Sequence, residues 1–98
     1  MVTVIAKYQA RTGAGDAVAV ILQKHVAATR SEPGCIQFDA FRSHENRDEF
    51  VLFERYVNEG AFEAHRASEH FAANVQAGIV PLLVKRNWHR YEEVAAAG

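Results

Sequence analysis

The chain has 98 residues, of which 49% are hydrophobic and 23% charged, and its formal net charge is −1. This composition is typical of a folded globular domain and excludes a disordered chain. The near-neutral charge argues against nucleic acid as the main partner, because phosphate binding needs a basic face. We expect one domain over residues 1–98, small enough for dimerisation to add stability.

The expected location is the cytoplasm. No apolar run approaches the ~20 residues of a membrane span, which argues against a membrane partner. The segment from Met1 to Lys7 has no basic region ahead of an apolar one, unlike a signal peptide. Cys35 is the single cysteine, so no internal disulfide is expected, and we interpret it as a buried structural thiol.

The first predicted elements are a strand and a helix. Residues 2 to 9 alternate weakly and indicate a strand. The turn from Thr12 to Asp16 then leads into a helix, with Thr12 or Asp16 as its capping residue. This helix is expected to run to about Arg30, and its apolar stripe consists of Val18, Ile21, Leu22, Ala28 and Thr29.

The second half of the chain predicts a hairpin, two short helical pieces and a last strand. Gly34 is expected to take a positive φ in a type II turn with Pro33. Strands over 36–43 and 49–56 follow, joined by a polar loop. Asn58 and Ser68 can each cap a helical piece. Pro81 ends this region, residues 84–94 form the last strand, and the tail 94–98 is expected to be frayed.

The element order is βαββαβ with the second helix broken in two, which is the ferredoxin-like α+β arrangement with an antiparallel sheet. Both faces of the hairpin carry large apolar groups, whereas a solvated face would be nearly all polar. One face holds Ile36, Phe38, Ala40, Phe50, Leu52 and Tyr56. The other holds Phe41, Val51 and Phe53. Because no further chain remains to cover that second face, we predict a homodimer that associates through it.

Three polar residues lie where the pattern calls for apolar ones. Glu54 stands between Leu52 and Tyr56, so it pairs with a cation, is protonated or faces a wet pocket. His25 falls in the middle of the apolar stripe of the first helix, either as a satisfied core histidine or as a group that projects into a cavity. His65 shares a helix face with Phe62.

No metal site is predicted. Ser68 interrupts the helix between His65 and His70, so these histidines do not form the i, i+4 pair that binds metals on continuous helices. No third ligand is evident. On the last strand, Trp88 and His89 must point to opposite faces, so one of them can line a pocket. The chain contains no glycine-rich nucleotide or flavin motif.

The segment from Glu32 to Phe71 resembles the antibiotic biosynthesis monooxygenase family. The shared pattern is the turn Glu32-Pro-Gly-Cys35, two alternating strands, a helix from Asn58 and the closing run Ser68-Glu-His-Phe71. The resemblance implies a dimeric α+β barrel with an apolar pocket in each subunit. Some members oxidise phenols, quinols or anthrones with dioxygen and no cofactor, and the neighbourhood of Glu54 and His65 is most similar to the quinol-oxidising members.

The residue pattern and the resemblance together predict a set of site residues, in a pocket expected between the sheet and the first helix and bounded by the helix of Phe62 and His65. The catalytic candidates are His65, Glu54 and His25, with a hydroxyl of a small aromatic substrate as the group to be deprotonated. The candidates for substrate binding are Phe38, Leu52, Tyr56, Phe62, His70 and Trp88. Heme-degrading relatives use a helix histidine that falls near Val75 here, which cannot bind iron, so no cofactor is expected.

Two other functions stay open. A branch of the superfamily isomerises or breaks down a phosphorylated signalling metabolite, and Arg42, Lys7 or Arg86 could bind its phosphate. The third possibility is a non-enzymatic dimeric barrel that binds a small ligand, as in a stress response. A pocket without a titratable group would favour that last interpretation.

Overall fold

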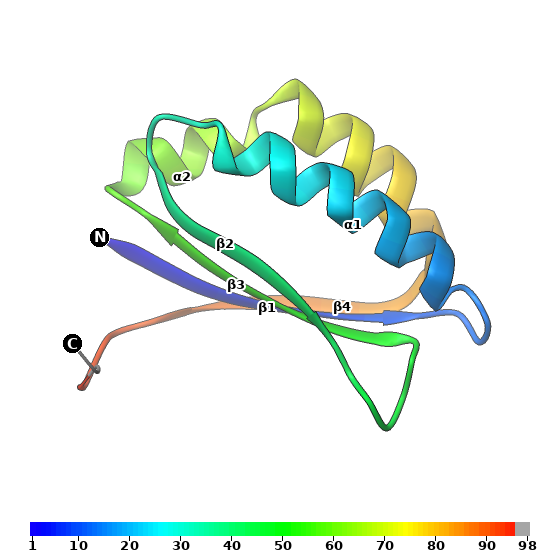
Figure 1. The fold of residues 1–98 in the computed structure, drawn as a ribbon. Helices are drawn as coiled ribbons and strands as arrows, with labels where there is room; N and C mark the ends of the chain where they lie inside the picture. The colour runs from blue at the N-terminus through cyan, green and yellow to red at the C-terminus, as the bar shows by residue number, and fades with distance from the viewer. Residues whose placement is uncertain (96–98) are drawn as a thin grey trace.

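The structure, a computed structural model, describes residues 1–95. One antiparallel sheet has the strand order β2-β3-β1-β4. Its strands are β1 (Val2–Ala10), β2 (Cys35–Arg42), β3 (Glu49–Tyr56) and β4 (Leu83–Tyr91). The helices are α1 (Gly15–Arg30), α2 (Glu59–Arg66), the π-helix η1 (Phe71–Ile79) and the short 3₁₀ helix η2 (Val80–Leu82). All helices lie on one side of the sheet, which confirms the ferredoxin-like prediction (Figure 1).

The start of α1 differs from the sequence prediction. Neither Thr12 nor Asp16 caps this helix, because its N-cap is Ala14 and no side chain of the cap accepts a hydrogen bond there. The carboxylate of Asp48 takes that role from the hairpin loop, accepting from the backbone N–H groups of Gly13 at 3.1 Å and Gly15 at 2.9 Å. An acceptor that lies far along the chain cannot be found from local spacing.

The turn before β2 also differs. Gly34 does not have a positive φ; among the described residues only Gly13 does. Glycine is nevertheless needed at position 34, since a Cβ there would lie 2.3 Å from the Cβ of Ala61. Glycine is therefore required here because the turn packs closely on α2, and not because the backbone is left-handed.

The other predicted features agree with the structure except at Ile36 and at the end of the last strand. Asn58 caps α2 by accepting from Ala61 N at 2.8 Å, and Ser68 accepts from Phe71 N at 3.1 Å, as predicted. A register shift next to Ile36 leaves this side chain 49% exposed, so it does not join the buried face. The last strand ends at Tyr91, before residue 94. Of the tail predicted to fray, residues 96–98 lie outside the described part.

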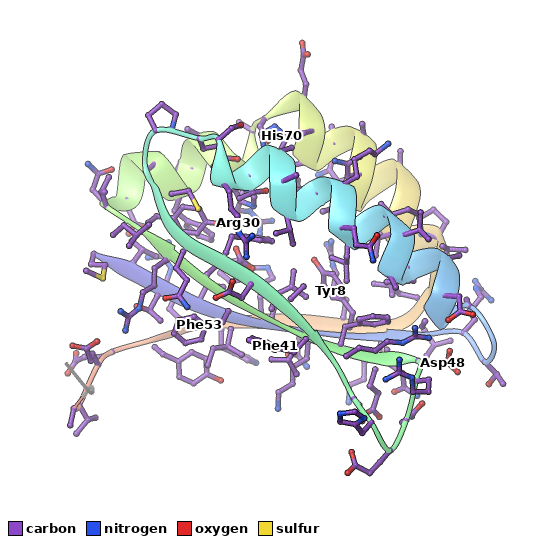
Figure 2. All side chains as sticks on the ribbon, in the orientation of Figure 1. Tyr8, Arg30, Phe41, Asp48, Phe53 and His70 are labelled. Atoms are coloured by element: carbon purple, nitrogen blue, oxygen red, sulfur yellow. The ribbon has the colours of Figure 1, made fainter. Side chains whose placement is uncertain are left out.

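The hydrophobic core fills the space between the sheet and the helices. It includes Val18 and Leu22 of α1, Phe38 and Leu52 of the sheet, and Val75 of η1, all at most 3% exposed. Figure 2 shows Tyr8 on the helix side of the sheet and Phe41 and Phe53 on the opposite side. That opposite side carries no chain among residues 1–95. Within the same range, no helix is long and apolar enough to cross a bilayer.

Candidate active site

Glu54 is a carboxyl group buried under the helices. Its position on β3 points it into the core face between Leu52 and Tyr56, and the residue is 6% exposed. The Tyr56 hydroxyl donates to Glu54 Oε1 at 2.6 Å. Burial raises the pKa of Glu54 to about 7, whereas the Tyr56 bond and the charge of Arg66 act in the lowering direction. No lysine or arginine of the described chain forms an ion pair with Glu54, which leaves it free to exchange a proton.

His65 faces Glu54 from the opposite layer. It lies in the last turn of α2 and is 2% exposed. Its Nε2 is 4.0 Å from Glu54 Oε1, and its Nδ1 is 2.9 Å from Glu32 Oε2. Burial lowers the pKa of His65, and the neighbouring Glu32 carboxylate opposes that shift. The two ring nitrogens of His65 therefore face two different carboxyl groups: Nε2 faces Glu54, and Nδ1 is bonded to Glu32.

Glu32 is a site residue that the sequence analysis missed. It lies in the turn between α1 and β2, and its Oε2 is also 2.5 Å from Nε2 of His70. The donor atoms of Glu32, His65 and His70 all lie within 4.8 Å of one another, so this group could by its donor types hold a metal ion. Only the folded chain brings these three positions together, because a glutamate in a turn is unremarkable in sequence.

His25 lies behind His65 in the core. It is 1% exposed, and its ring centroid is 5.6 Å from that of His65 and 5.7 Å from that of His70. Its Nε2 is 3.5 Å from Thr29 Oγ1, and its Nδ1 has no hydrogen-bond partner. Burial, together with the two neighbouring histidines, lowers the pKa of His25 to about 4. The imidazole is therefore neutral at pH 7.

A small cavity of about 20 Å³ lies between the sheet and the pair α2 and η1. This volume holds about one water molecule. Apolar and aromatic groups line most of it: Val4, Ala6, Tyr8, Phe62, Phe71 and Trp88. Its charged or titratable groups are Glu54, His65, Arg66 and Arg86.

The cavity lies under α2 and η1, whereas the pocket was predicted between the sheet and the first helix, bounded by the helix of Phe62 and His65. Of the predicted site residues, Glu54, His65, Phe62 and Trp88 line it. The others lie outside its lining. Phe38, Leu52 and Tyr56 are at most 1% exposed in the surrounding core, and His25 and His70 contact the far side of His65.

The exposed end of the cavity is formed by Arg66, Arg86 and Trp88. The guanidinium carbon of Arg66 lies 4.7 Å from the ring centroid of Trp88 and 5.4 Å from that of Phe71. Trp88 is 37% exposed and packs edge-on against Phe62 at 5.5 Å. Arg66 was not predicted as a site residue, since an arginine near a helix end usually faces water.

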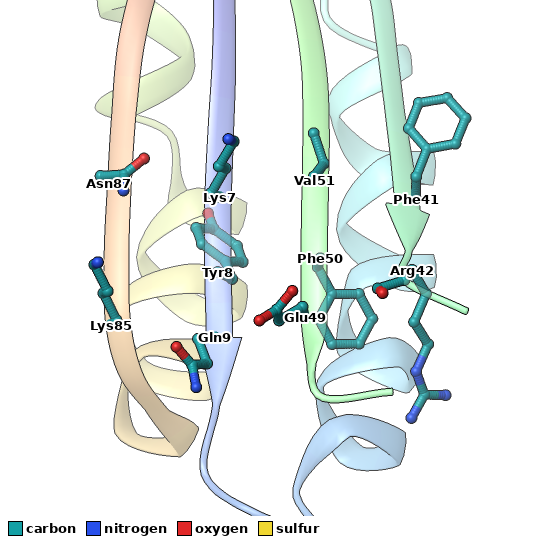
Figure 3. A pocket seen from close by; sticks show the side chains of 11 residues that line it. Lys7, Tyr8, Gln9, Phe41, Arg42, Glu49, Phe50, Val51, Lys85 and Asn87 are labelled. Carbon is teal, nitrogen blue, oxygen red and sulfur yellow. The ribbon is translucent and has the colours of Figure 1, made fainter. Parts of the chain in front are cut away.

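A larger hollow of about 370 Å³ lies on the other face of the sheet (Figure 3), and His65 is not among the residues that line it. It is bounded by Lys7, Gln9, Phe41, Val51 and Lys85, among others. Two of its apolar members, Phe41 and Val51, belong to the surface that is predicted to contact a second subunit. We therefore place the candidate chemistry at the smaller cavity, where titratable groups are buried.

Comparison with known proteins identifies the family to which the chain belongs. The family model described as antibiotic biosynthesis monooxygenase matches residues 1–77, so the chain belongs to that family. It is 37% identical over 84 residues to a Mycobacterium tuberculosis protein named "Putative monooxygenase Rv0793", covering 86% of this chain and 81% of that protein.

Solved structures show the same fold over nearly the whole chain. The structure of that mycobacterial protein superposes with a TM-score of 0.88 at 32% identity, covering 99% of this chain and 98% of the other. A structure described as an antibiotic biosynthesis monooxygenase gives a TM-score of 0.90 at 28% identity over 97% and 100% of the two chains. Protein PA3566 of Pseudomonas aeruginosa gives 0.89 at 29% identity over 96% and 94%. These matches confirm the predicted family and fold.

Proposed function

We propose that the protein is a cofactor-independent monooxygenase that oxidises a small electron-rich phenol, quinol or anthrone with dioxygen. The observation that carries this proposal is the pair His65 Nε2 and Glu54 Oε1, 4.0 Å apart at one cavity. Both groups are buried, and the pKa of Glu54 is raised to about 7. A proton acceptor near neutral pKa is what deprotonation of a phenol at pH 7 requires.

The proposed reaction starts with proton transfer from the substrate hydroxyl to the pair of His65 Nε2 and Glu54, which share the proton between them. The resulting oxyanion passes one electron to dioxygen, and the radical pair combines to form a carbon–oxygen bond. The peroxide takes the proton back, and the carbon that bears it loses its hydrogen as the oxygen–oxygen bond breaks. One oxygen atom stays in the product as a carbonyl, the other leaves as water, and the substrate supplies all electrons.

Substrate entry requires movement at the exposed end of the cavity. The enclosed space holds about one water molecule, enough for a hydroxyl group but not for a ring. The half-exposed Trp88 and the neighbouring Arg66 close this end. In the proposed complex the ring lies against Trp88 and Phe62 while the hydroxyl points to His65. His25, with its free Nδ1, serves as a neutral neighbour of the His65 imidazole.

The site is proposed to work without a resident metal, heme or flavin. The oxygen of Glu32 is already bonded to both His65 and His70, so the three donors satisfy one another. Val75, near which the sequence comparison places the iron ligand of heme-degrading relatives, is fully buried in the core. Elemental analysis of freshly purified protein should find no stoichiometric iron or zinc. A stoichiometric metal that needs Glu32 for retention would assign the triad to metal binding instead.

A second subunit is proposed to cover the open face of the sheet. The supporting observation is that Phe41 is 59% exposed and Val51 is 37% exposed on a face that carries no chain among residues 1–95. Dimerisation would remove these apolar groups from water. The cavity lies on the other face of the sheet, within one chain.

Aerobic incubation with a panel of quinols and anthrones in metal-free buffer tests the activity. Oxygen uptake should depend on His65, and His65→Ala should lower turnover with little change in thermal stability. His44→Ala is the matched control, because His44 is exposed in the hairpin loop and does not line the cavity. A protein that binds the panel without consuming oxygen would support a non-enzymatic ligand-binding role instead.

A further inference from the structure

Two arginines at the cavity have no protein partner among residues 1–95. Arg66 and Arg86 make neither an ion pair nor a hydrogen bond to another residue there. Every other arginine of the chain does: Arg30, Arg42, Arg55 and Arg90 pair with carboxylates, and Arg11 and Arg47 donate to backbone oxygens. The two unpartnered guanidinium groups are therefore concentrated at one place, the exposed end of the cavity.

The aromatic surroundings hold Arg66 in a defined position. Its guanidinium carbon lies over Trp88 at 4.7 Å and over Phe71 at 5.4 Å. Such stacking occupies the faces of the guanidinium plane and leaves its N–H edge free to donate. An arginine held in this way loses little further freedom when it binds a carboxylate or phosphate in the bidentate geometry.

Both arginines act electrostatically on the interior of the cavity. Burial raises the pKa of Tyr8, and the charges of Arg86 and Arg66 both oppose that increase. Arg66 likewise acts to lower the pKa of Glu54. Their positive charge is thus directed toward the groups that line the cavity. No carboxylate of the described chain neutralises it through an ion pair.

We propose that Arg66 and Arg86 bind an anionic group of the substrate, and that Trp88 packs against the aromatic ring that carries it. This inference rests on the proposed oxidation and narrows its substrate class to aromatic hydroxy acids. The hydroxyl enters the small cavity beside His65 and Glu54. The carboxylate stays outside, where the two guanidinium groups can donate to it.

The same two positive charges have a second effect on the proposed reaction. Deprotonation of the substrate hydroxyl places a negative charge on the ring oxygen, close to the guanidinium groups. Positive charge next to a developing oxyanion stabilises it more than the neutral phenol. Arg66 and Arg86 would therefore serve both recognition and ionisation of the substrate.

Binding can be measured independently of turnover because Trp88 is the only tryptophan of the chain. Its single indole N–H resonance reports occupation of the site in ¹H–¹⁵N spectra, and calorimetry gives the dissociation constant. The probes are 4-hydroxy-2-naphthoate and 1-naphthol, which differ by a carboxylate in the position meta to the hydroxyl. We expect the acid to bind at least about tenfold more tightly and to shift the Trp88 resonance.

The substitutions Arg86→Gln and Arg66→Gln should each remove most of this tenfold preference and leave the binding of 1-naphthol nearly unchanged. Lys24→Gln is the matched control, since it removes one positive charge from an exposed position on α1 that does not line the cavity. Thermal melts identify any variant that fails to fold. Because Arg66 also packs on aromatic rings, the exposed Arg86 gives the cleaner test.

The outcomes separate this inference from the proposed function. Equal affinity for the acid and the neutral phenol would overturn the anion site, while oxygen uptake could still support the oxidation. Tight Arg86-dependent binding of the acid without oxygen uptake would support the anion site and sink the oxidase proposal. Preferential binding of an aliphatic sugar phosphate, added as a third probe, would overturn the aromatic substrate class and favour an isomerase.

Discussion

Glu32 Oε2 lies 2.9 Å from His65 Nδ1, and this contact determines which imidazole nitrogen meets the cavity. A carboxylate can only accept, so Nδ1 carries the hydrogen of the neutral ring. The lone pair then resides on Nε2, the atom that lies 4.0 Å from Glu54 Oε1. When Nε2 takes a proton, the Glu32 charge stabilises the imidazolium, as the aspartate does in a catalytic triad.

We expect Glu32→Gln to lower turnover at least about tenfold, because the variant loses both the fixed tautomer and the compensating charge. Its effect should appear in kcat more than in KM, since Glu32 does not line the cavity. Oxygen uptake against substrate concentration measures both constants. Glu63→Gln, an exposed change on α2, is the control. Unchanged turnover of a folded Glu32→Gln protein would remove the orienting role.

Glu54 should give the fold a measurable dependence on pH. Its folded-state pKa of about 7 lies above the ordinary value of 4.5, so its contribution to stability is fully present below pH 4.5 and is lost as the pH rises through 7. Glu54→Gln removes this dependence. As the pH rises from 4.5 to 8, the wild type should therefore lose on the order of 2 kcal/mol of unfolding free energy relative to the variant.

Urea titrations at several pH values measure this difference. Glu63→Gln again serves as control, because that carboxylate is exposed and its variant should follow the wild-type pH curve. A constant difference between Glu54→Gln and wild type over the whole range would show that Glu54 ionises normally in the folded protein. The proposal that it shares a proton with His65 would then lose its basis.

His25 should make the folded protein less stable as the pH falls, which is opposite to the effect of Glu54. Its folded-state pKa of about 4 lies below the ordinary 6.5, so its contribution is present above pH 6.5 and is lost as the pH falls through 4. His25→Phe removes the group that must stay neutral and also the unpartnered Nδ1. As the pH falls from 6.5 to 4, we expect the wild type to lose about 2 kcal/mol of unfolding free energy relative to the variant. Acid titration followed by circular dichroism measures this, with the exposed His44→Phe as the matched variant.

Local sequence patterns were sufficient to predict most of the fold. Alternation in β3 gives its bounds as observed, and Asn58 caps α2 because both partners of that bond lie within one turn. Glu54 could be recognised as anomalous since its neighbours on the same strand face are apolar. In each case, the information needed lies within a few residues of the feature itself.

The features that escaped prediction depend on contacts between distant segments. The cap supplied by Asp48 and the close approach of Ala61 to Gly34 both join elements far apart in sequence. The same is true of Glu32, whose role follows from its bonds to His65 and His70. A polar residue in a turn or at a helix end carries no periodic signal, so only the folded arrangement reveals it.

The last prediction concerns the proposed dimer. Light scattering at micromolar concentration should give about twice the monomer mass of 10.9 kDa. Phe53→Arg and Phe41→Arg should each shift the protein toward the monomer, because each places a charge in a contact that excludes water. Val20→Arg is the matched control: Val20 is 67% exposed on α1, which covers the opposite side of the sheet, so its variant should stay dimeric. A wild-type protein that remains monomeric under these conditions would sink the proposal, and the exposed Phe41 would then be available to a different partner.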